Sequence, residues 1–304
     1  MHPAVARHAG VFARGMLIGI ADLIPGVSGG TIAFITGIYE RLLNCIRLGS
    51  SPAVLLQLLR GEIRLFWRSV DGSFLAVLLA GAAVAIFAGA DLVHLLLAEH
   101  TALILAFFLG LTLSAAAWLA RELRPRADLA ACAAAGLALA LAVGLLAPAE
   151  SAAAPPLYAF FAAGALALCA MILPGISGSL LLLLFGFYPH LIEALHQRDL
   201  AVIAVFAAGG IGGLALFARL LGWILRRWRD RTLALLIGVM LGAVVKLWPW
   251  KEPADGVRVI LQANVLPAAE PGLAYAAVLF AVGCASVFAV ERAAQRMRQA
   301  LAGS

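Results

Sequence analysis

The sequence predicts an all-α integral membrane protein built from two repeats of inverted topology. Of its 304 residues, 64% are hydrophobic and only 12% are charged, whereas soluble domains are about 45–50% apolar and about 25% charged. Several apolar stretches approach the roughly 20 residues that a helix needs to cross a bilayer. The motif Pro-Gly-x-Ser-Gly occurs twice, and arginines gather beside alternate stretches. Each repeat is expected to hold a helical hairpin followed by three transmembrane helices.

The first repeat, residues 1–147, opens with a hairpin over residues 12–47. Its Pro-Gly motif lies inside an apolar stretch, and proline with several glycines breaks a helix there. The arm Phe12–Ile24 has 13 residues, about 20 Å of helix, which is too short to reach the far side. This favours a re-entrant hairpin; one that crosses twice stays open.

Residues 54–68 are predicted to form an amphipathic helix at the membrane surface. Arg60, Arg64 and Arg68 follow one another at spacings of four beside Trp67. Such a face is typical of a helix that lies on an anionic leaflet. A solvated charged face is the alternative.

The remaining elements are long apolar helices and the linker between the halves. An external linker is expected at 148–156, and the second repeat at 157–304. The predicted transmembrane helices are 74–97, 102–120 and 129–147 in the first repeat, and 200–221, 232–248 and 273–290 after the second hairpin, 157–197.

The two halves arose by duplication. A shift of 149 residues aligns Gly15–Ile46 with Gly164–Leu195 and leaves ten of 32 positions identical without a gap. A second copy of the motif would arise by chance in roughly half a percent of chains at ordinary residue frequencies.

Charge predicts that the repeats are inverted. If both hairpins return to their starting side, 18 of the 22 basic residues lie on the cytoplasmic side, as the positive-inside rule requires. If each motif were a single crossing, the division would be 12 against 10. The number of crossings per half is therefore odd, and the two halves have opposite orientation, as in many secondary transporters. We expect a bacterial inner-membrane protein with both termini in the cytoplasm.

Both motifs are candidate anion sites. Each leads into a half-helix whose N-terminus carries partial positive charge and free amides. Tight helix crossing through small residues is the alternative explanation. The candidate phosphate ligands are Ser28, Gly29, Gly30, Thr31, Ser177, Gly178 and Ser179, and the residues that shape the hairpins are Pro25, Gly26, Pro174 and Gly175.

Asp22 is a candidate coupling residue for a proton or cation. It stands in an apolar arm, where an ionised carboxylate costs at least about 2.5–3.5 kcal/mol unless it is paired or hydrated. Its counterpart in the second repeat is Met171, so it is no symmetric packing feature. A capped or arginine-paired structural acid is equally compatible with the pattern.

Other functional classes fit the composition less well. The net charge of +6 comes from residues beside membrane segments, so anionic lipids are better partners than nucleic acid. The four cysteines are scattered singly, without the spacing of a metal or disulfide set. We expect no cleaved signal peptide, no metal and no cofactor. The sequence does not predict an oligomeric state.

The run Gly19–Thr31, continued by Gly37–Glu40, resembles the signature of the bacterial undecaprenyl-phosphate translocases of PopT type. The second motif, Ile172–Ser179 with Gly186 and Tyr188, is similar to that family as well. The resemblance implies a flippase that returns the polyprenyl monophosphate carrier from the outer to the cytoplasmic leaflet for peptidoglycan and other envelope polymers. It implies roles for Asp22 and for both sets of motif residues named above.

Two rival functions stay open. One is a secondary transporter of a small soluble anion, which would use the same positive helix ends. The other is a membrane lipid phosphatase or phosphotransferase, which needs clustered acids or a histidine among cations around the phosphoryl group. The sequence has only 16 acids, and none pair within the apolar stretches. This favours a transporter over an enzyme.

Overall fold

The computed structural model describes residues 3–24, 28–145, 155–252, 262–267 and 272–302, and this part of the chain is all-helical. The first half contains α1 (Pro3–Leu23), α2 (Gly29–Ile35), α3 (Tyr39–Gly49), α4 (Pro52–Leu59), α5 (Ile63–Ser69), α6 (Gly72–Glu99), α7 (Thr101–Ala120) and α8 (Ala127–Leu145). The second half contains α9 (Leu157–Ile172), α10 (Gly178–Leu184), α11 (Phe187–Gln197), α12 (Leu200–Arg227), α13 (Arg229–Leu247) and α14 (Gly272–Ala302).

The helices confirm a multi-pass membrane architecture. Within the described residues, α6, α7, α8, α12 and α14 are each long and apolar enough to cross a membrane, and up to seven spans result if two bent helix pairs are counted as one span each. Helix α13 coincides with the fifth predicted segment, 232–248. It carries charged residues at both ends, which lower its mean hydropathy, while most of its middle is buried in the bundle.

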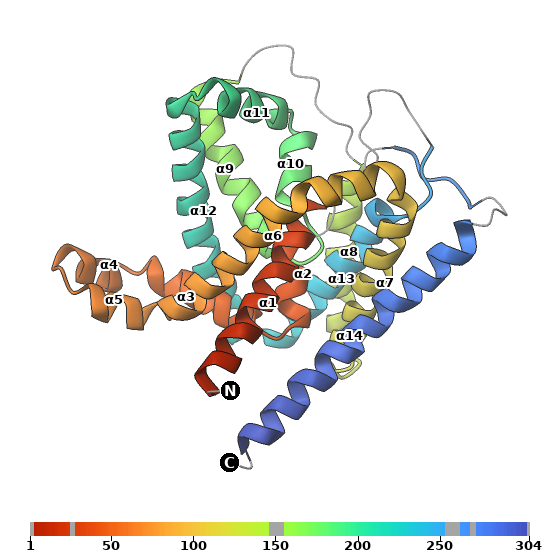
Figure 1. The fold of residues 1–304 in the computed structure, drawn as a ribbon, viewed down its shortest axis with the longest axis horizontal. Helices are drawn as coiled ribbons and strands as arrows, with labels where there is room; N and C mark the ends of the chain where they lie inside the picture. The colour runs from red at the N-terminus through yellow and green to blue at the C-terminus, as the bar shows by residue number, and fades with distance from the viewer. Residues whose placement is uncertain (1–2, 25–27, 146–154, 253–261, 268–271, 303–304) are drawn as a thin grey trace.

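The ends of the helices fall into two groups (Figure 1). Helix α1 begins and α14 ends at the lower end of the view, where α3, α4 and α5 also lie. Helix α11 and the turn between α6 and α7 lie at the upper end, and α12 runs from α11 down to the lower end. The first hairpin therefore ends near the lower face and the second near the upper face.

The predicted surface helix at 54–68 is wrong as a single element. The chain forms α4 and α5, which are separated at Arg60, Gly61 and Glu62. Gly61 has a φ of +74°, a conformation that only glycine adopts without strain, and it turns the chain. Arg60 therefore stands at the end of α4, and only Arg64 and Arg68 share one helix.

The long helices pack in pairs through glycines that face a neighbouring backbone. A Cβ on Gly15 of α1 would overlap the carbonyl oxygen of Leu78 in α6, and a Cβ on Gly164 of α9 would overlap that of Phe206 in α12. Small residues let membrane helices approach this closely. Six further contacts of this kind form three equivalent pairs: Gly81 on Phe12 with Gly209 on Phe161, Gly110 on Phe280 with Gly238 on Ala133, and Gly283 on Phe107 with Gly136 on Leu235.

Two of the four helix pairs combine the halves. Helix α1 packs on α6 and α9 packs on α12, each within one half, but α7 packs on α14 and α8 packs on α13. Helix α13 also contributes the largest fully buried side chains, Leu236, Met240 and Leu247. The two halves therefore share one interior.

We expect Gly238→Ala to destabilise the protein by about 1–3 kcal/mol, the usual cost of overpacking, because its Cβ would overlap the carbonyl oxygen of Ala133. Gly89→Ala on α6 is the matched control, since its Cβ would meet nothing closer than Leu23 Cδ1 at 4.0 Å. Thermal unfolding in detergent measures both. Equal midpoints for the two variants would contradict the close packing of α8 and α13.

Candidate functional site at the two helix breaks

The chain breaks between α1 and α2 (the first break) and between α9 and α10 (the second break), and the described residues of the two breaks lie in contact with each other in the interior. The Ser28 hydroxyl lies 3.0 Å from the carbonyl oxygens of both Met171 and Leu173, to either of which it can donate. In return, the amide of Gly175 donates to Thr31 Oγ1 at 3.1 Å. Ser28 and Thr31 are 1% and 2% exposed. Polar groups of one break thus satisfy the backbone of the other.

The N-terminus of α2 already has an anionic partner within the chain. The amide of Gly29 donates to Asp22 Oδ1 at 2.8 Å, and the amide of Gly30 donates to Ser28 Oγ at 3.1 Å. The Thr31 amide donates to the Ser28 carbonyl at 2.9 Å. Asp22 therefore caps this helix, which the sequence pattern left as one of two alternatives. Pro25 and Gly26 lie outside the described residues.

The N-terminus of α10 is arranged differently. Ser177 and Ser179 share a hydrogen bond between their hydroxyls at 2.9 Å, and Ser177 does not cap the helix with its side chain. No described residue accepts a hydrogen bond from the amides of Gly178 or Ser179. Met171 packs against Gly178 where Asp22 packs against Gly29 in the first half. The N-terminus of α10 thus presents amide donors without an acceptor among the described residues, whereas the N-terminus of α2 donates to the Asp22 carboxylate.

Gly175 lies at the turn of the second break. Its φ is +87°, which disfavours any other residue. A Cβ at this position would also lie 2.9 Å from Met240 Cα on α13. Pro174, beside it, is fully buried.

A small cavity of about 160 Å³ adjoins the first break. Asp22, Gly29 and Gly30 line one side of it, and Tyr39 and Leu43 of α3 line another. The Tyr39 hydroxyl is buried and has no hydrogen-bond partner among the described residues. Tyr39 lies in the run Gly37–Glu40 and was not among the site residues predicted from the sequence.

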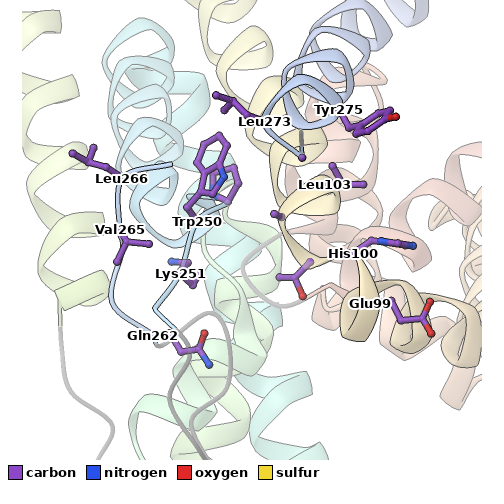
Figure 2. A pocket seen from close by; sticks show the side chains of 14 residues that line it. Glu99, His100, Leu103, Trp250, Lys251, Gln262, Val265, Leu266, Leu273 and Tyr275 are labelled. Carbon is purple, nitrogen blue, oxygen red and sulfur yellow. The ribbon is translucent and has the colours of Figure 1, made fainter. Parts of the chain in front are cut away.

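A larger recess of about 940 Å³ opens between the turn from α6 to α7 and the start of α14 (Figure 2). Trp250, Lys251, Leu266 and Tyr275 line it. Lys251 Nζ donates to Asn264 Oδ1 at 2.6 Å. Burial, and then the neighbouring charge of Lys246, lower the pKa of Lys251 to about 8. No local sequence pattern predicts this recess, because its walls come from segments about 150 residues apart.

Helices α4 and α5, which hold Arg64 and Arg68 and flank Arg60, lie beside the helix bundle. Helices α4 and α5 project sideways at the lower end (Figure 1), and Arg60, Arg64 and Arg68 are exposed. Leu59 and Ile63 are also exposed, by 84% and 65%. The segment therefore combines apolar and basic side chains on an open surface.

The described residues do not bring together three His, Cys, Asp or Glu side chains that could hold a metal ion. The four cysteines are free thiols, and Cys45 is buried.

Comparisons with known proteins identify the family of this chain. Residues 18–260 match a family described as "VCA0040-like: Undecaprenyl phosphate translocase-like". A "Polyprenyl-phosphate transporter" of Vibrio cholerae serotype O1 (strain ATCC 39315 / El Tor Inaba N16961) is 38% identical over 269 residues, 86% of each chain. A "Polyprenyl-phosphate transporter" of Staphylococcus aureus (strain NCTC 8325 / PS 47) is 30% identical over 264 residues, 78% of this chain and 84% of the relative. No solved structure matches significantly. The chain belongs to the undecaprenyl phosphate translocase-like family.

Proposed function

We propose that this protein is a transporter that moves polyprenyl phosphate from the outer to the cytoplasmic leaflet of the bacterial inner membrane. The carrier would then be used again for envelope polymers. The contact between two broken helices deep in the bundle carries the proposal, because broken helices at a repeat interface are where secondary transporters bind their substrates. The names of the two relatives favour the lipid phosphate as substrate, and transport over phosphatase chemistry.

We propose that the two breaks together hold the lipid phosphate, through the hydroxyls and amides at Ser28–Thr31 and Ser177–Ser179. The unpartnered amides of Gly178 and Ser179 support the second break as the stronger anion donor. At the first break, the phosphate has to replace Asp22 at Gly29 and has to separate Ser28 from α9. Substrate binding is therefore coupled to opening of the contact between the halves.

We propose that the two halves are inverted repeats and that each hairpin is re-entrant. Helices α2 and α10 have seven residues each, about 10 Å of helix, which is too short to cross. The equivalent glycine contacts in the two halves support the duplication. The termination of α3 at the lower end and α11 at the upper end supports the inversion.

We place the lower end of the molecule, with both termini, in the cytoplasm. Arginines surround that end: Arg47, Arg124, Arg226 and Arg229 are among them. The exposed basic and apolar residues of α4 and α5, including Arg60, Arg64 and Arg68, would then lie on the anionic inner leaflet.

The substrate assignment is tested by reconstitution in vesicles with a labelled polyprenyl phosphate, its alcohol and a small soluble phosphate as separate substrates. We expect movement of the lipid phosphate alone.

The phosphate ligands are tested by binding. Ser177→Ala and Ser28→Ala should each weaken affinity for the phosphate over the alcohol by about 10- to 100-fold, the value of a hydrogen bond to a charged group. Ser286→Ala, on a hydroxyl that bonds only within its own helix, is the control. Unchanged preference in both variants would place the anion site elsewhere.

The proposed coupling role of Asp22 is tested by Asp22→Asn. The amide oxygen can still accept from Gly29, so thermal stability should change little, while the charge is removed. We expect flux to lose its dependence on the proton or cation gradient, whereas lipid binding persists. If the gradient dependence is retained in full, Asp22 acts only as the cap of α2.

The orientation is tested by cysteine labelling from outside the cell in a cysteine-free background. We expect a cysteine at position 152 to react and one at position 229 or 124 to be protected. Reaction at 229 without reaction at 152 would reverse the proposed topology.

A further inference from the structure

We propose that a second phosphate site lies in a pocket between α3, α12 and α13, with Arg47 and Arg226 as its main ligands. The ligand chemistry is a phosphate monoester dianion. Under the proposed function, on which its identity as a lipid rests, this is the carrier phosphate after it has left the helix breaks. The pocket shares no residue with either Pro-Gly motif.

The pocket encloses about 390 Å³ at the lower end of the bundle. Its walls combine three arginines, Arg47, Arg226 and Arg229, with one acid, Glu40, and with uncharged residues of the same helices. The Nε atom of Arg47 is buried and has no hydrogen-bond partner among the described residues, although its Nη2 donates to Asn44 at 2.7 Å. A buried guanidinium N–H without an acceptor is costly, so a bound oxyanion would satisfy it.

Gly222 is where the two main arginines converge. A Cβ built on this glycine would lie 3.5 Å from Arg226 Nη1, 3.7 Å from Arg47 Cδ and 3.8 Å from Leu43 Cδ2. Both arginine side chains therefore lie beside Gly222 on the same face of α12. Guanidinium groups match the geometry of phosphate oxygens and bind them with paired hydrogen bonds.

The charges of the pocket are not balanced within the described part of the chain. Arg229 is shared between Glu40 at 3.8 Å and Glu122 at 3.4 Å. No described acid lies within ion-pair distance of Arg47 or Arg226. Two neighbouring cations repel each other, and a dianion between them would remove that repulsion. In the upper recess, by contrast, Lys251 already donates to Asn264.

The pocket adjoins the cavity beside the first helix break. Leu43 of α3 lines both spaces, and the cavity reaches Asp22, Gly29 and Gly30. Leu43 therefore lies between the two spaces, and under this proposal a phosphate that leaves the breaks moves past it to the arginines at the end where α1 begins. An arginine pocket there suits release to the leaflet on that side.

Protection from alkylation tests occupancy of the pocket. In a background without the four native cysteines, Gly222→Cys places a thiol between Arg47 and Arg226 at ordinary contact distances. We expect polyprenyl phosphate to slow its alkylation at least tenfold and the polyprenyl alcohol to leave the rate unchanged. Arg227→Cys, at an exposed position at the same end of α12, should react equally fast with and without the lipid. Inorganic phosphate is tested in parallel and tells a free anion from a lipid-borne one.

The arginines themselves are tested by the affinity of the detergent-solubilised protein for polyprenyl phosphate. We expect the double variant Arg47→Gln/Arg226→Gln to weaken this affinity by about 10- to 100-fold, and Arg227→Gln to leave it unchanged. The wild type and these two variants should have equal thermal stability. Arg226→Lys keeps the charge but loses the paired N–H donors of the guanidinium group, so its affinity should be intermediate.

Two outcomes would overturn the site: equal protection of the Gly222→Cys thiol by phosphatidylglycerol, a diester, or full affinity in the double glutamine variant. These results are independent of the transport assay. If wild-type protein moves the lipid phosphate but neither arginine matters, the pocket assignment fails alone; if wild-type protein moves no lipid phosphate, the proposed function fails.

Discussion

The fold depends on one constraint, that backbone groups at membrane depth must find hydrogen-bond partners inside the protein. Breaking α1 from α2 and α9 from α10 leaves amides and carbonyls without helical partners. The chain satisfies several of them by bringing the two breaks together: Ser28 reaches the carbonyls at the end of α9, and Gly175 reaches Thr31. Neither break could be stable alone in the apolar interior. The same groups that hold the halves together are therefore those with which an anionic ligand would compete.

The two breaks are related by sequence but differ in charge. Asp22 occupies the N-terminus of α2, while its counterpart Met171 lies against Gly178 at the start of α10. A carboxylate at one break and unpartnered amides at the other make the centre electrostatically uneven. Under the proposed function, the second break attracts the lipid phosphate, and the acid of the first break has to be displaced or protonated. Asp22 is then the place where a coupling proton would act.

Much of the architecture could be predicted from the sequence. Hydropathy located the long helices, and proline with glycine located the breaks near Ser28 and Ser177, because both signals are local. The break between α4 and α5 was missed, since the regular spacing of the arginines outweighed a single glycine at position 61. The bond from Ser28 to α9 and the meeting of Arg47 with Arg226 could not be predicted, because each joins segments more than 100 residues apart. The family resemblance identified the transporter class, which the comparisons confirm.

The pairing of α7 with α14 and of α8 with α13 limits how the protein can move. Each pair takes one helix from each half and is packed backbone to backbone at glycines such as Gly110 and Gly238. The halves therefore cannot swing apart as two rigid bodies without separating both mixed pairs. These four helices instead form a common frame. Under the proposed function, we expect α1 with α6 and α9 with α12, each of which adjoins one hairpin, to move against this frame as two arms that meet where α3 packs on α12.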